Sequence, residues 1–101
     1  MAEHFNQLTP AELEVIAVLS EECAEVQQEI GKILRHGLDS KNPFDPKSVT
    51  NLEKLRIELG DILAALELLE RVGLVSRSEL ETLKERKLKK LPRFLHHVDL
   101  E

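Results

Sequence analysis

The stretch from Ile57 to Leu69, Ile-Glu-Leu-Gly-Asp-Ile-Leu-Ala-Ala-Leu-Glu-Leu-Leu, decides the fold of this chain. Its leucines, isoleucines and alanines predict a helix that is apolar around most of its circumference. Glu58 and Asp61 are three residues apart, so on a helix they share one face, and that face is the apolar one. A surface helix usually keeps its carboxylates opposite its leucines. Something must therefore compensate these two charges.

The composition of the whole chain indicates a single all-α domain. The chain has 101 residues, of which 42% are hydrophobic and 33% are charged, as is typical of a folded globular protein. The low content of Gly and Pro and the absence of alternating Val/Thr runs favour helices throughout. We expect one domain over residues 1–101, with a helical core from about 9 to 91 and a basic tail over 84–97.

Several classes of protein are disfavoured by the sequence. No apolar run approaches the length of a membrane span, and the first seven residues lack the basic and apolar regions of a secretory signal. The single Cys23 excludes an internal disulfide and fits the cytoplasm, where we expect the protein to act. The net charge of −5 argues against a general nucleic-acid binder, although residues 84–93 carry six basic side chains.

Three short motifs predict where the helices begin. In each of them a hydroxyl residue precedes a glutamate by three positions, which is typical of a capping box: Thr9-Pro10-Ala11-Glu12, Thr50-Asn51-Leu52-Glu53 and Ser76-Arg77-Ser78-Glu79. The first helix should end at Gly37, the second at Gly73 and the third at Pro92. Residues 37–50 should form a turn-rich connector, and a connector this long in a small domain often has a function.

The apolar pattern predicts an oligomer. We expect the core stripe of the first helix to contain Leu13, Ile16, Ala17, Ala24, Ile30 and Leu34, widened by Leu19, Cys23 and Val26. Three helices are too few to bury a helix as apolar as residues 52–72, so we expect a homodimer or homotetramer that completes a bundle of four or more helices. The alternative is that the connector covers the surplus apolar surface.

The first helix carries its own set of acids beside the apolar stripe. Glu22 and Glu25 are three residues apart, and Glu29 follows one turn later. Taken alone, such a triple most often forms a solvated helix face. If the first two helices pack antiparallel, however, four carboxylates converge on one point: Glu22, Glu25, Glu58 and Asp61.

Four converging carboxylates need protons or cations. Two unit charges about 5 Å apart repel by roughly 3 kcal/mol at an effective dielectric of about 20. Four carboxylates make six such pairs, whose sum approaches or exceeds the ~5–15 kcal/mol stability of a small domain. Oxygen ligands without His or Cys suit Mg²⁺, with Mn²⁺ as a substitute. Di-iron bundles use Glu-x-x-His, a spacing that this chain does not contain.

The two acidic segments carry a family resemblance. Glu21-Glu22-Cys23-Ala24-Glu25 followed by Glu58-Leu59-Gly60-Asp61 resembles the EExxE…ExxD signature of the MazG-like all-α nucleoside triphosphate pyrophosphohydrolases, over roughly residues 12–90. The resemblance implies a helical dimer or tetramer that uses Mg²⁺ to split a (deoxy)nucleoside triphosphate into a monophosphate and pyrophosphate. It implies catalytic roles for Glu21, Glu22, Glu25, Glu58 and Asp61, of which the last four would be metal ligands.

Three details qualify this resemblance. Glu21 points away from Glu22 on the helical wheel, so a surface or inter-subunit contact is an equal alternative for it. Glu25 and Glu58 are separated by the 32 residues 26–57, somewhat more than is usual in the family, and the excess lies in the connector. The chain has no Trp or Tyr to stack a base, so we expect a roomy pocket that selects the base weakly and tolerates purines.

Basic side chains are the expected substrate contacts. Lys32 lies on the acidic side of the first helix, where it could reach a phosphate. The basic segment, of the same chain or of a neighbouring one, could supply three more: Lys84, Lys87 and Arg93. A solvated helix face that balances the acids is an equally good interpretation of this segment.

The sequence leaves two kinds of function open. One is the hydrolase described above, with a phosphodiesterase acting on another diphosphate compound as a variant that shares the metal site. The other is a non-enzymatic dimeric helical interaction module, whose acids form salt bridges to the basic segment across an interface. Stabilisation by Mg²⁺ would distinguish the two.

Overall fold

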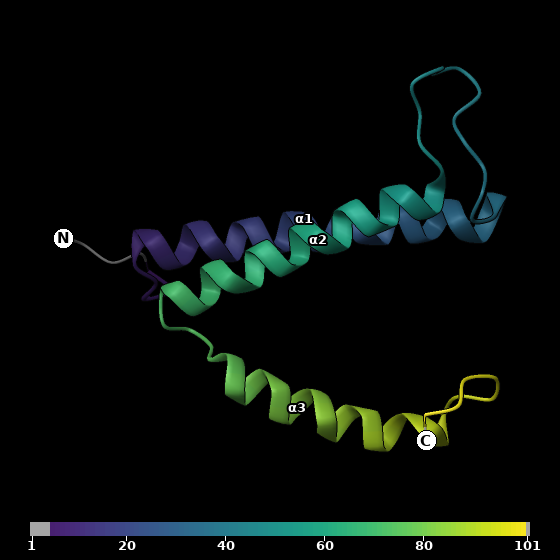
Figure 1. Ribbon diagram of the computed structural model, residues 1–101. Helices are drawn as coiled ribbons and strands as arrows, with labels where there is room; N and C mark the ends of the chain where they lie inside the picture. The colour runs from purple at the N-terminus through teal and green to yellow at the C-terminus, as the bar shows by residue number, and fades with distance from the viewer. Residues whose placement is uncertain (1–4, 101) are drawn as a thin grey trace.

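The computed structural model describes residues 5–100, and every structural statement below concerns these residues. They form three helices, α1 (Pro10–His36), α2 (Asn51–Arg71) and α3 (Arg77–Lys90), followed by a single 3₁₀ turn, η1 (Leu91–Arg93) (Figure 1). No strand occurs in this range, so the expected all-α fold is confirmed. The expectations for residues 1–4 and Glu101 lie outside the described residues. No described helix is both long and apolar enough to cross a membrane.

Local hydrogen bonds explain where each helix begins. Thr9 Oγ1 accepts a hydrogen bond from the Glu12 amide at 3.1 Å, and Glu12 Oε1 accepts one from the Thr9 amide at 2.8 Å, which completes the predicted capping box. Thr50 and Ser76 accept from the amides three residues later at 3.1 and 3.2 Å. Each such cap contributes about 1 kcal/mol to stability. All three predicted starts are confirmed.

Glycine residues follow the first two helices, as expected. Gly37 has a φ of 92° and donates its amide to the Ile33 carbonyl at 2.7 Å. Helix α2 ends at Arg71, and Gly73, with a φ of 83°, turns the chain towards α3. Positive φ values strain residues that carry a Cβ, which explains why glycine occupies both positions.

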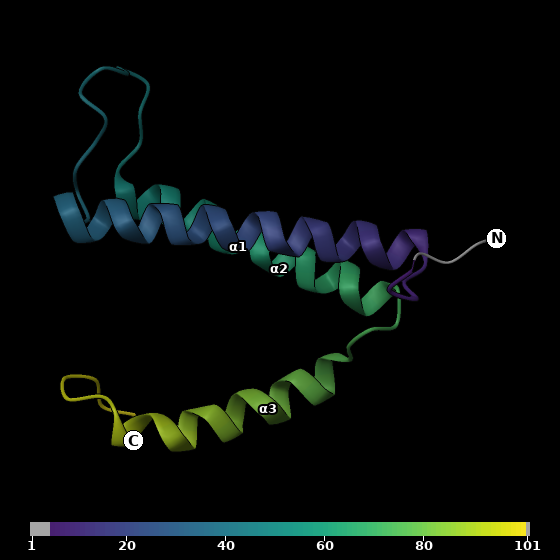
Figure 2. The same cartoon turned by 180° about the vertical axis from the view of Figure 1, so that it is seen from behind.

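Helices α1 and α2 pack side by side as an antiparallel hairpin closed by the connector 37–50 (Figures 1 and 2). The interface between them is apolar at the end where α1 begins, where Val15, Ala65 and Leu69 are buried. Towards the connector the buried side chains are instead Glu29 and Glu58. The hairpin therefore has an apolar half and an acidic half.

The expected core stripe of α1 is wrong for the single chain. The side chains of Leu13, Ile16, Ile30 and Leu34 are exposed, Leu34 by 81%, and so are Ala17, Cys23 and Ala24. Only Leu19 and Val26, at the edge of that stripe, are partly covered. The face of α1 that packs against α2 instead carries Val15, Glu22, Glu25 and Glu29. Apolar residues occur on two sides of α1, and the side that also carries these acids is the one that faces α2.

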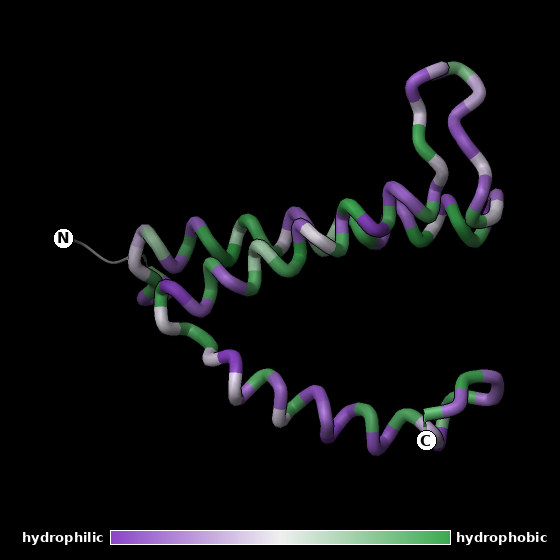
Figure 3. Tube along the Cα trace, viewed as in Figure 1, coloured by the Kyte–Doolittle hydropathy of each residue, from purple (hydrophilic) through white to green (hydrophobic). Residues whose placement is uncertain are grey.

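Helix α3 leaves the hairpin and runs apart from α1 (Figures 1 and 2). Its first turn is tied to α2, since the Arg77 amide donates a hydrogen bond to Glu70 Oε2 at 2.8 Å. No side chain of α3 is buried, and hydrophilic residues prevail along it, whereas apolar residues recur along α1 and α2 (Figure 3).

This arrangement leaves a large surface exposed. The chain exposes 8350 Å², whereas a compact protein of this mass exposes roughly 5,800 Å². The radius of gyration is 17.5 Å, compared with about 13 Å for a compact domain of this length. A single chain therefore does not bury the apolar surface that its sequence provides.

Candidate metal centre

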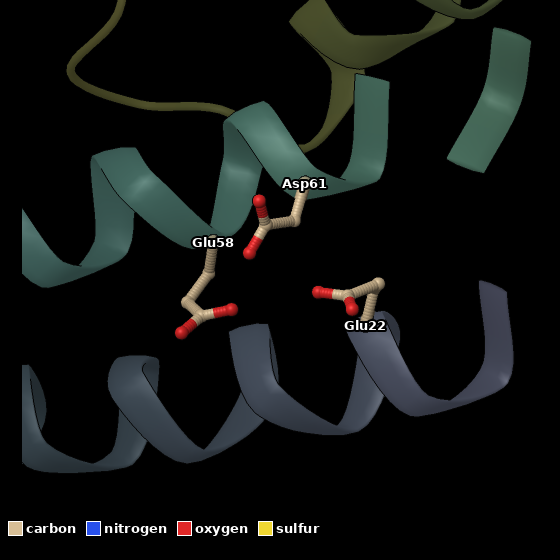
Figure 4. Close-up of side chains that lie close together, drawn as sticks. All are labelled: Glu22, Glu58 and Asp61. Atoms are coloured by element: carbon tan, nitrogen blue, oxygen red, sulfur yellow. The ribbon is translucent and has the colours of Figure 1, made fainter. Parts of the chain in front are cut away.

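Carboxylates from two helices meet in the middle of the hairpin. Glu22 comes from α1, whereas Glu58 and Asp61 come from successive turns of α2. One oxygen of each of these residues lies within 4.8 Å of the other two. Figure 4 shows the three carboxyl groups turned towards one another in the space between the helices. The antiparallel packing thus gathers acids that are far apart in the sequence.

Glu25 joins this group through Glu58. The two side chains are within hydrogen-bonding reach across the hairpin, as are those of Glu22 and Asp61. The structure therefore brings together all four acids that the sequence analysis named as metal ligands, three in one group and Glu25 beside it. Glu21 is exposed and lies outside the three-residue group.

Two oxygens of the cluster lack partners. Glu58 Oε2 and Glu22 Oε2 are both buried without a hydrogen bond, and the Glu58 residue as a whole is only 8% exposed. A buried, unpaired carboxylate oxygen is unfavourable, because it loses its water and gains nothing in exchange. A cation between the two helices would satisfy both oxygens, and the all-oxygen donor set fits Mg²⁺ or Mn²⁺.

The pKa values in the cluster also indicate that its carboxylates lack a nearby positive charge. Burial, a hydrogen bond with Glu25 and the charges of Glu25, Asp61 and Glu22 raise the pKa of Glu58 from 4.5 to about 7. Burial and then the charges of Asp61, Glu25 and Glu21 also raise the pKa of Glu22. In the absence of a cation Glu58 therefore retains its proton close to neutral pH, and a bound cation would displace it.

A fifth acid, Glu29, extends the cluster towards the connector. Glu29 is 3% exposed, and its Oε1 accepts a hydrogen bond from Lys32 Nζ at 3.2 Å, while its Oε2 is buried without a partner. Sequence reasoning placed Glu29 on the acidic face of α1 but not in the site. Its position one turn after Glu25 was the signal that could have included it.

A pocket of about 700 Å³ opens beside Glu58 at the connector end of the hairpin. The end of α1, the connector and the start of α2 line it. Five basic side chains contribute to this lining: Lys32, Arg35, Lys41, Lys47 and Lys54. Only Lys32 was expected here. The other four were missed, because they come from three separate segments and form no motif in the sequence.

The basic residues expected from the C-terminal segment lie elsewhere in the single chain. Lys84 pairs with Glu81 at 2.6 Å and lines a groove between α2 and α3. Lys87 and Arg93 are exposed on α3 and η1. None of the three lines the pocket beside Glu58. Any role for them in that pocket would have to come from a neighbouring chain.

Comparisons with known proteins found no matching protein-family model, no matching curated protein and no matching solved structure. The side chains of the site themselves indicate its chemistry. These provide carboxylates suited to a hard divalent cation, next to a cationic pocket suited to an anion.

Proposed function

We propose that the protein is a Mg²⁺-dependent nucleoside triphosphate pyrophosphohydrolase. It would add water across the bond between the first two phosphates of a (deoxy)nucleoside triphosphate, and the products would be a monophosphate and pyrophosphate. Its biological task would be the removal of non-standard nucleotides or the adjustment of a nucleotide pool. The proposal rests chiefly on one observation: a carboxylate cluster with buried, unpaired oxygens borders a pocket lined by five basic side chains.

The residues of the cluster would share the work in a simple way. Glu22, Glu25, Glu58 and Asp61 would hold the metal, which when bound would polarise the phosphate oxygens. Glu58 would give up its proton as the cation binds, since its raised pKa reflects a lack of positive charge. Lys32, held by Glu29 at the pocket wall, would balance negative charge on the phosphates.

The resemblance to the MazG-like signature supports the same assignment. Its two halves lie on α1 and α2, and four of its five acids, all except Glu21, approach one another. A MazG-like helical bundle would require further helices beside this hairpin. The groove of about 920 Å³ between α2 and α3, lined by Leu63, Leu66 and Leu80, offers a place for them.

We infer that a second copy of this chain covers that groove, either in a homodimer or in each dimer of a homotetramer. The surface exposed beyond that of a compact protein amounts to roughly 2,500 Å². A standard interface buries about 800 Å² per partner, so the surplus is ample for one. The outer face of α1, with Leu13, Ile16 and Ile30, provides further apolar surface for the contact. In such an assembly α3 of one chain could bring Lys84, Lys87 or Arg93 to the pocket of another.

The test of the proposed activity is a product assay. Purified protein is incubated with standard and modified triphosphates and Mg²⁺, and the products are separated by anion-exchange chromatography. We expect monophosphate and pyrophosphate in equal amounts, and no turnover in EDTA. Glu58→Gln should abolish turnover and Glu14→Gln, an exposed acid on α1, should not. Release of orthophosphate would contradict the proposal. Absence of both hydrolysis and Mg²⁺ binding would favour the interaction module.

A further inference from the structure

The pocket beside Glu58 has the charge of a polyphosphate site. Its five basic side chains face two carboxylates, Asp45 and Glu58. Because Glu58 belongs to the metal cluster, the remainder of the lining carries a net charge of +4. A nucleoside triphosphate carries about −4 near neutral pH, a diphosphate about −3 and a monophosphate about −2. The charge of the pocket thus matches a triphosphate better than the shorter chains.

The cationic side chains are available for a ligand. Within residues 5–100, Arg35, Lys41, Lys47 and Lys54 form no ion pair with a carboxylate. Lys32 is the exception, and its partner Glu29 holds it at the border between the acid cluster and the pocket. Four unpaired cations around one cavity repel one another, and a bound anion would relieve that repulsion.

The connector that carries two of these lysines is held in place by its own hydrogen bonds. Ser48 Oγ accepts from the Asn42 amide at 3.1 Å, and Asp45 Oδ1 accepts from the Lys47 amide at 3.0 Å. Asn51 Nδ2 donates to the Gly37 carbonyl at 3.1 Å, which ties the start of α2 to the end of α1. The pocket is therefore formed before a ligand arrives, and binding would require little ordering of the chain.

The same pocket offers little to recognise a base. No Phe lines it and the chain has no Trp or Tyr; Phe44, in the connector, is 92% exposed and is not among the lining residues. The imidazole of His36 is the one aromatic ring among the lining residues. The recognition chemistry of this cavity is therefore mainly electrostatic.

We propose that this pocket is a polyphosphate subsite that selects its ligand by the number of phosphates and not by the base. The phosphate chain would extend from the metal cluster at Glu58 to Lys41 and Lys47 in the connector, with Lys54 and Arg35 along its sides. The assignment rests on the proposed function in naming a nucleotide as the natural ligand. The anion site itself depends only on the pocket.

The test measures binding of inorganic tripolyphosphate, pyrophosphate and orthophosphate to the full chain in EDTA, by isothermal titration calorimetry. We expect affinity to fall in that order. The double substitution Lys41→Ala/Lys47→Ala should weaken tripolyphosphate binding by about tenfold. The matched control, Lys89→Ala/Lys90→Ala on exposed α3, removes the same charge outside the pocket. It should change the affinity for tripolyphosphate less than twofold. All four substituted side chains are exposed, so the fold should persist, which circular dichroism can verify.

The outcomes separate this inference from the proposed function. Equal losses in the two double variants, or no binding of tripolyphosphate, would overturn the subsite even if the protein hydrolyses triphosphates. Tripolyphosphate binding that depends on Lys41 and Lys47, without hydrolysis of any nucleotide, would support the subsite and reject the proposed reaction. Among active substrates, a KM that follows the base and not the phosphate number would also overturn the subsite.

Discussion

Glu58 of α2 meets Glu25 of α1 across the hairpin, and the burial of Glu58 together with this contact raises its pKa to about 7. Two carboxyl groups in contact in a partly buried site are unusual in a structure that has to be stable near neutral pH. The contact makes the acidic half of the hairpin dependent on protons when no cation is present.

The metal-free protein should lose stability as the pH rises. Between pH 4.5 and about 7 the folded chain binds more protons at Glu58 than the unfolded chain, so the free energy of unfolding falls through this window. The raised pKa of Glu22 acts in the same direction. Urea denaturation in EDTA at several pH values measures the slope, and Glu58→Gln should flatten it. A stability that increases from pH 5 to 7 would contradict the pKa shift.

Mg²⁺ and Mn²⁺ should stabilise the fold. A ligand at a hundred times its Kd adds about 2.7 kcal/mol to the free energy of unfolding. Because binding displaces protons from the cluster, the increase in melting temperature should be larger at pH 8 than at pH 6. Differential scanning fluorimetry measures both effects. Glu58→Gln and Asp61→Asn should reduce the increase, whereas Glu14→Gln should leave it unchanged; an equal increase in all variants would place the ion elsewhere.

Glu29→Gln should affect substrate binding more than turnover. The substitution keeps the shape of the side chain but removes the charge that holds Lys32 Nζ at 3.2 Å. We expect KM for a triphosphate to rise several-fold, because Lys32 would no longer be held where it can contact the phosphates. The value of kcat should change by less than about threefold. Steady-state kinetics measures the two constants separately. Loss of kcat with an unchanged KM would instead indicate that Glu29 belongs to the metal site.

Leu63→Lys should dissociate the proposed oligomer. Leu63 is 69% exposed in the single chain and lines the groove between α2 and α3, so a charge there would remain unpaired in an interface. Size-exclusion chromatography with light scattering should show a smaller particle, with a lower melting temperature. Phe44→Lys, in the connector and outside the groove, is the matched control. A wild-type protein that is monomeric at all concentrations would contradict the oligomer.

Much of the helical framework could be predicted from local sequence. The starts at Thr9, Thr50 and Ser76 and the turns at Gly37 and Gly73 depend on hydrogen bonds and φ angles within a few residues. Such interactions are short-ranged, so the residues that make them are close in the chain. For the same reason the pairing of Glu22 with Glu25, and of Glu58 with Asp61, on single helix faces could be derived from their spacing.

The packed face of α1 could not be predicted in this way. Leu13, Ile16 and Ile30 form one apolar stripe on α1, and the buried Val15 lies in another. Helical periodicity alone does not say which of the two stripes packs against α2. The choice depends on contacts with another helix, and the exposed stripe is the surface that we assign to a second chain. The pattern thus contained the right residues for burial but not the partner that covers them.

By itself, therefore, the sequence determined the helices, their ends and the two pairs of acids, because these features depend on neighbours along the chain. Tertiary structure alone decided the rest of the site. The antiparallel packing of α1 on α2 placed Glu58 against Glu25, buried it and so raised its pKa. Closure of the connector gathered Lys32, Lys41 and Lys54 around one pocket. Ile57 to Leu69 marked the site, but only its contact with α1 gave the two acids a common environment.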